Sequence, residues 1–113
     1  MVERPVDLIK VEWRLQFNGL QFEALEIDLV HINTGKKQTR ASSYSVSDVV
    51  FIFDKIVNGA ALYPVDARKY KNVACEYFIK SGLSDGNKYK IVFCICSDRP
   101  RTIGILTMHR VRK

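Results

Sequence analysis

The stretch IKVEWRLQFNG, residues 9–19, decides the fold that we expect for this chain. Apolar residues alternate strictly with charged or polar ones over residues 9–17, which is the pattern of a strand with one buried face. Asn18 and Gly19 follow, and this dipeptide accepts the positive φ angles of a two-residue hairpin turn. The sequence therefore predicts an N-terminal β-hairpin whose second strand begins at Leu20.

That second strand is expected to cover residues 20–32. Its apolar positions change phase between Ala24 and Leu25, which indicates either a β-bulge or a helical end, and we favour the bulge. His31 shares the parity of Leu25, so we expect it at the end of the apolar face, beside a polar loop of residues 33–43. The loop contains three cations and no acid: Lys36, Lys37 and Arg40.

One amphipathic helix is expected after this loop. Ser45 is a suitable N-cap, and Asp48 lies in the first turn, where a carboxylate is favoured by the helix dipole. Apolar residues recur at helical spacing through residues 46–57, and the Asn-Gly pair at residues 58–59 ends the pattern.

The remaining sequence predicts strands. Residues 60–71 contain Pro64 and fit a short edge strand or a loop. Residues 73–80 and 89–96 read as an antiparallel pair, and residues 103–111 as a last strand. The expected fold class is α+β, with one main helix packed on a curved, mainly antiparallel sheet and an N-terminal β-hairpin.

The length and composition agree with a single domain over residues 1–113, of which 47% are hydrophobic. No apolar run approaches the ~20 residues of a membrane-spanning helix, and no signal-peptide pattern opens the chain. We therefore expect a cytoplasmic protein without a membrane partner. The three cysteines lack the paired spacing of zinc or redox motifs, so we expect reduced, mostly buried thiols.

The charge is unevenly distributed along the chain. Eighteen Lys and Arg residues outnumber twelve Asp and Glu residues, which gives a formal net charge of +6. Residues 1–65 carry a net charge of −1, whereas residues 66–113 carry +7. A basic excess favours polyanionic partners such as nucleic acid, although a basic surface also aids solubility or meets an acidic protein.

The residues that could carry chemistry are histidines and cations. The sequence has no glycine-rich phosphate loop, metal-binding motif or nucleophile elbow, so we expect no metal and no cofactor. Metal-independent RNA cleavage needs a base for the ribose 2′-hydroxyl, an acid for the departing 5′-oxygen and cations for the phosphate. The residues suited to these tasks are His31, Lys36, Lys37, Arg40, Tyr44, Arg101, His109 and Arg112.

His109 and Arg110 are expected on opposite faces of the last strand. His109 has the parity of Ile103 and Ile105, whereas Arg110 has the parity of Met108. A bulge or a frayed end would be needed to bring both into one site.

The closing stretch resembles a known family. The segment KYKIVFCIC at residues 88–96, a turn, and RTIGILTMHR at residues 101–110 resemble the C-terminal hairpin of RelE-type ribonuclease toxins. The wider group joins the barnase, EndoU, colicin nuclease and RelE folds, in which a helical part precedes a four-stranded antiparallel sheet. The resemblance implies that His109 and Arg110 are catalytic, and that Lys90 and Arg101 contact phosphate.

The function expected from these observations is that of a small ribonuclease or toxin-like domain that cleaves RNA by 2′-hydroxyl attack. The alternative is a non-catalytic nucleic-acid-binding or protein-interaction module of a phage, plasmid or mobile element. The expected partners are RNA, such as tRNA or mRNA, and an acidic antitoxin or immunity protein docked at the edge of the N-terminal hairpin.

Overall fold

The structure is a computed structural model and describes residues 8–34 and 44–111. Along the chain the elements are β1 (Ile9–Phe17), β2 (Leu20–Ile27), α1 (Leu29–Thr34), α2 (Val46–Val57), β3 (Asp66–Tyr70), β4 (Val73–Ser84), β5 (Asn87–Cys96) and β6 (Thr102–Arg110).

The expected α+β fold class is wrong. The chain is mostly sheet, with 57% strand and 18% helix, and the strands form one six-stranded mixed sheet. In the described residues only α2 reaches seven residues, so the molecule is mostly a six-stranded mixed sheet and not a main helix packed on a sheet. The strand content is high because β4 and β5 extend to a two-residue turn and β3 adds a further strand at the edge.

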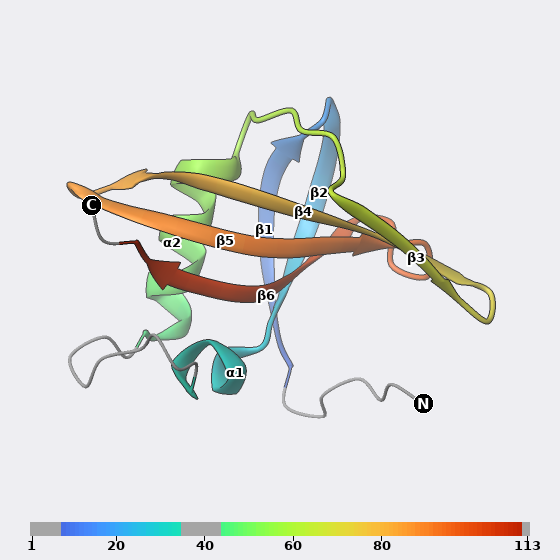
Figure 1. Ribbon diagram of the computed structural model, residues 1–113, viewed down its shortest axis with the longest axis horizontal. Coiled ribbons are helices and arrows are strands. Elements are labelled where there is room, and N and C mark those ends of the chain that lie inside the picture. The colour runs from blue at the N-terminus through green and yellow to red at the C-terminus, as the bar shows by residue number, and fades with distance from the viewer. Residues whose placement is uncertain (1–7, 35–43, 112–113) are drawn as a thin grey trace.

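The strand order is β1-β2-β6-β5-β4-β3, so the last strand lies in the middle of the sheet. β2 and β6 pair in parallel, whereas the other neighbours are antiparallel. Figure 1 shows β1 and β2 running steeply across the direction of β4, β5 and β6, with α2 behind these three strands. The sheet therefore bends around the helix.

The N-terminal hairpin is confirmed. β1 and β2 pair from Ile9 with Ile27 to Phe17 with Leu20, and Asn18 (φ 54°) and the following glycine (φ 76°) make the turn. The register shifts between Glu12 and Leu15 of β1, so the irregularity of this hairpin lies in its first strand.

The expected strand over residues 20–32 is too long. A register irregularity does lie beside the phase change at Ala24, but its extra residue is in β1 and not in β2. β2 stops at Ile27, and the other alternative, a helical end, is found as α1. Asp28 starts this helix because its side chain accepts a hydrogen bond from the backbone N–H of His31 at 3.1 Å. The phase change itself lies inside β2, where Ala24 and Leu25 are both buried, so it does not mark the start of α1.

Helix α2 agrees with the sequence prediction. Ser45 Oγ accepts the N–H of Asp48 and the Asp48 carboxylate accepts the N–H of Ser45, which is a complete capping box. The buried face of α2 packs on the sheet, where Phe53 meets Phe93 edge to face at 5.2 Å between ring centroids. Phe93 also stacks on Phe78, so aromatic rings fill the centre of the core.

The sheet has an inner face that packs on α2 and an outer face that points away from it. Phe78 and Gly82 of β4 belong to the inner face, since Phe78 is buried in the core and a Cβ at Gly82 would lie 2.9 Å from Ile56 of α2. Side chains alternate along a strand and opposite residues share a face. The strand register therefore assigns to the outer face Asp66, Arg68, Tyr70, Val73, Cys75, Tyr77, Ile79, Ser81, Leu83, Lys88, Lys90, Val92, Cys94 and Cys96.

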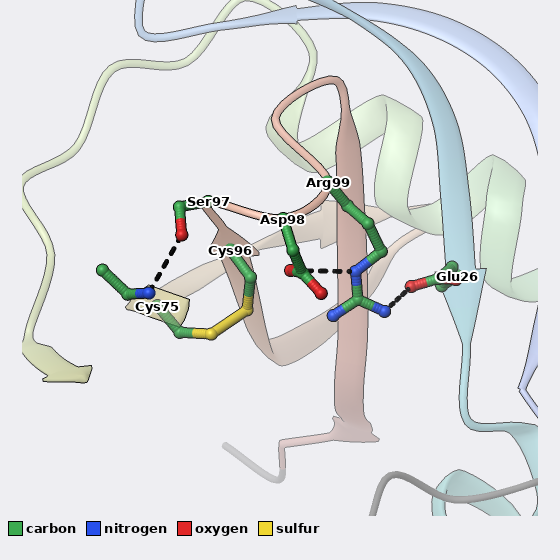
Figure 2. Close-up of a disulfide and its surroundings, with 7 residues drawn as sticks. Glu26, Cys75, Cys96, Ser97, Asp98 and Arg99 are labelled. Atoms are coloured by element: carbon green, nitrogen blue, oxygen red, sulfur yellow. Dashed lines mark hydrogen bonds and ion pairs between the residues drawn. A yellow bond between two sulfur atoms is a disulfide. The ribbon is translucent and has the colours of Figure 1, made fainter. Parts of the chain in front are cut away.

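The expectation of reduced thiols is wrong for two cysteines. Cys75 and Cys96 are directly opposite on β4 and β5, with Cα atoms 4.1 Å apart, and form a disulfide on the outer face (Figure 2). Ala74 and Ser97, the next pair along, hydrogen-bond to each other, so the cysteines occupy a non-hydrogen-bonded position, where side chains approach most closely. Cys94 is a buried cysteine outside this disulfide.

No helix in the described part of the chain is long and apolar enough to cross a membrane.

Candidate functional site

A bulge in β6 decides which face each C-terminal residue occupies. Val92 pairs with Thr107, but Phe93 pairs with Ile105, so Leu106 is an extra residue in β6. Beyond this bulge His109 lies opposite Lys90. His109 is therefore on the outer face, and the parity that aligned it with the buried Ile105 in the sequence is broken.

The outer face brings an imidazole and an ammonium group together at the end of β6. His109 and Lys90 are cross-strand neighbours, a position in which Cβ atoms are about 5 Å apart. Both side chains are partly exposed. Lys88 lies two residues before Lys90 on the same face, and Ser81 of β4 is opposite Lys90. This arrangement can bind a phosphate and exchange a proton beside it.

Arg110 lies on the inner face, as its sequence parity relative to His109 predicts. It is opposite Tyr89, whose ring is buried in the core. The ring of Tyr44 meets the ring of Tyr89 edge to face, with centroids 6.3 Å apart. The structure therefore groups Arg110 with Tyr44 and Tyr89, and it separates both Arg110 and Tyr44 from His109 by the thickness of the sheet.

Tyr44 is held in place by an asparagine that sequence reasoning missed. Asn33 donates its side-chain N–H to the carbonyl of Tyr44 at 3.0 Å and accepts the Tyr44 N–H at 2.8 Å. Asn33 is on α1 and Tyr44 is eleven residues later, so the contact depends on the tertiary fold. No local pattern in the sequence could have revealed it.

The hydroxyl of Tyr44 is a proton donor near neutral pH. Burial raises the pKa of Tyr44 from its ordinary 10.0, and Tyr89 and Asp48 raise it further, whereas the charge of Arg110 lowers it. A phenol with a raised pKa keeps its proton and can donate a hydrogen bond, but it is a poor base.

His31 lies on α1, exposed, and is not at the end of a strand. Its helix packs beside β6, and the backbone N–H of Asp28, just before α1, donates to the carbonyl of Ile105 at 3.3 Å. The structure thus places His31 and His109 on neighbouring elements, and His109 lies in the part of β6 that extends beyond its pairing with β2.

Arg101 is not part of this group. It lies just before β6, about 30 Å from Arg110 along the strand. Its guanidinium is 3.6 Å from the carboxylate of Glu23. Arg99, in the same turn between β5 and β6, forms ion pairs with Asp98 and with Glu26 of β2 (Figure 2). These ion pairs link the turn to β2.

Four further predicted residues lie outside the described part of the chain: Lys36, Lys37, Arg40 and Arg112. The described residues hold no group of three or more histidine, cysteine, aspartate or glutamate side chains placed to bind a metal ion. Comparisons with protein-family models, with curated proteins and with solved structures found no match.

Proposed function

We propose that this protein binds RNA on the outer face of the sheet, where the start of β5 lies beside the end of β6, and cleaves it without a metal ion. The observation that supports this proposal is the pairing of His109 with Lys90 on an exposed face, with Lys88 beside them. An imidazole can accept a proton at neutral pH, and the two lysines supply positive charge for a phosphate.

In the proposed reaction His109 takes the proton of the ribose 2′-hydroxyl. The 2′-oxygen then forms a bond to phosphorus, and the bond from phosphorus to the 5′-oxygen breaks. His31 on α1 acts as the general acid and gives a proton to the departing 5′-oxygen. The products are a 2′,3′-cyclic phosphate and a free 5′-hydroxyl, while Lys90 balances the charge that develops on the phosphate oxygens.

The proposal also gives Tyr44 and Arg110 a different role from the one expected from the sequence. Both lie on the inner face, with Tyr44 contacting the buried Tyr89 and Arg110 directly opposite it, so we propose that they position the end of β6. A positioning residue changes the rate through the strand that carries His109, without a contact to RNA.

The test is the incubation of purified protein with RNA in the presence of EDTA. We expect cyclic-phosphate products, and a loss of about a hundredfold or more in rate for His109→Ala. Lys90→Ala should also slow cleavage, whereas Lys69→Ala, which removes the same charge from the inner face, should not. Intact RNA at high protein concentration would contradict the proposal.

A second candidate is a non-catalytic RNA-binding module, and one observation favours it. His109 and Arg110 point to opposite faces of the sheet, so the histidine-arginine pair of the resemblance cannot act together on one phosphate. This candidate predicts RNA binding that weakens with salt and yields no product.

The proposed acidic antitoxin or immunity protein would dock on β1, which is a terminal strand of the sheet in the described residues. Its outer edge is bonded to residues 58–60 near Gln16 and Phe17, so the partner would pair with the part of β1 before Gln16. We propose the cytoplasm as the location only for a form in which Cys75 and Cys96 are reduced, because structural disulfides persist mainly in oxidising compartments.

A further inference from the structure

The outer face also carries aromatic rings at some distance from His109. Tyr77 of β4 is half-buried and Tyr70 of β3 is 52% exposed. The register of β3, β4 and β5 puts both rings on the outer face, and Tyr77 lies opposite Cys94. Cys94 is four positions from Lys90 along β5, so Tyr77 is about 13 Å from the proposed phosphate site.

Each of these rings has a cation over it. The guanidinium carbon of Arg68 lies 5.9 Å from the centroid of Tyr77, and the ammonium of Lys71 lies 5.6 Å from the centroid of Tyr70. The Arg68 side chain is 75% exposed, although its Nε pairs with Asp66 at 2.9 Å. A flat cation on a ring, open to solvent, is a surface on which another planar group can stack.

The outer face is accessible between the rings and Lys90. Ile79 is exposed, and Val92 opposite it is partly exposed. Figure 1 shows no described helix in front of β4 and β5, since α2 lies behind them. A continuous path therefore leads from Arg68 and Tyr77 to Lys90 and His109.

We propose that Tyr77, Tyr70 and Arg68 form a base-stacking subsite, so that the RNA bound by this protein is single-stranded. Bases stack on aromatic rings and guanidinium planes irrespective of sequence, but a duplex hides the faces of its bases. The positive charge of Arg68 and Lys71 beside the rings suits the phosphates of the same strand. This inference rests on the proposed function and names the form of its substrate.

The experiment compares the binding of two labelled RNAs by fluorescence anisotropy: an oligouridine and a hairpin duplex of the same length. We expect the wild type to bind the oligouridine about tenfold or more tightly than the duplex. Tyr77→Ala should weaken oligouridine binding about tenfold and leave duplex binding unchanged, whereas Tyr77→Phe, which keeps the ring, should bind as the wild type does.

Tyr63→Ala is the matched control, because Tyr63 is 94% exposed and lies outside the strands. It should bind both RNAs as the wild type does. Arg68→Ala should weaken oligouridine binding, and Lys69→Ala, on the inner face, should not.

The outcomes separate the two proposals. Equal affinity for both RNAs, or wild-type affinity in Tyr77→Ala, overturns the subsite and leaves the proposed function standing. A wild type that binds neither RNA overturns both and favours a protein partner for this face. If Tyr77→Ala unfolds, which thermal denaturation would show, Arg68→Ala carries the test.

Discussion

The phenol of Tyr44 is a residue whose surroundings predict a pH effect on stability. The pKa of Tyr44 is raised in the folded protein, first by burial, so the folded state holds this proton more tightly than the unfolded state does. The resulting stabilisation is fully present below pH 10 and is lost as the pH rises through the folded pKa.

We therefore expect the free energy of unfolding to decrease above pH 10, and to decrease less in Tyr44→Phe, which cannot ionise. Urea denaturation at a series of alkaline pH values measures this. Tyr63→Phe is the control, since Tyr63 is almost fully exposed. An equal decrease in all three proteins would show that Tyr44 does not contribute.

Gly82 is required where β4 packs on α2. A Cβ at this position would lie 2.9 Å from Ile56 Cγ2 and 3.1 Å from Ile56 Cγ1. We expect Gly82→Ala to destabilise the protein by about 1–3 kcal/mol, because the helix or the strand must move. In an Ile56→Ala background the same change should cost less, and a double-mutant cycle measures the difference. Additive effects would contradict this contact.

At the scale of elements, the disulfide joins the start of β4 to the end of β5. It closes a loop with a sequence separation of 21 residues, for which the loss of chain entropy in the unfolded state predicts a stabilisation of about 3 kcal/mol. Chemical denaturation of Cys75→Ala/Cys96→Ala should show this loss.

A reducing agent should lower the stability of the wild type to a similar extent and leave the double variant unchanged. Cys94 is present in both proteins, so it serves as an internal control for effects of the reagent on a thiol. A wild type whose stability is insensitive to reduction would contradict a structural role for the disulfide.

The elements that the sequence predicted correctly have local signals. Alternation and an Asn-Gly turn define the β1–β2 hairpin, and a capping box with helical spacing defines α2. α1 was missed because its start depends on one carboxylate, Asp28, and its residues have the hydrophobicity of a strand. The disulfide was missed because Cys75 and Cys96 meet only through the register of β4 with β5.

The candidate site was predictable only in part for the same reason. Lys90 and Lys88 alternate with buried residues, so their common face could be inferred. The face of His109 could not, because the bulge at Leu106 reverses the parity of β6 and has no signal in the sequence. The contact of Asn33 on α1 with Tyr44, which lies just before the N-cap of α2, depends on the tertiary fold and is equally invisible in the sequence.

At the scale of the whole molecule, the topology explains why the fold class was wrong. β6 enters between β2 and β5 and pairs in parallel with β2, which joins the N-terminal hairpin to the C-terminal strands in one sheet. Nothing in the order of the elements requires this insertion, since strands that follow one another usually pair with each other. The mixed sheet therefore depends on the pairing of strands that are far apart in the sequence, β2 and β6.

The distribution of charge over the molecule gives a last prediction. If RNA binds to the outer face, then cations of that face, and not the net charge of +6, determine how binding depends on salt. Each phosphate contact on a single strand contributes about −0.7 to the slope of log affinity against log salt concentration. Lys88→Ala/Lys90→Ala should therefore reduce the slope by about 1.4, if each lysine contacts one phosphate.

The matched control removes the same two charges elsewhere. Lys55 lies on α2 and Lys69 on the inner face of β3, and both are exposed. Lys55→Ala/Lys69→Ala has the same net charge as the outer-face variant and should keep the wild-type slope. Equal slopes in the two double variants would mean that RNA responds to the overall charge, and the outer face would then have no special role in binding.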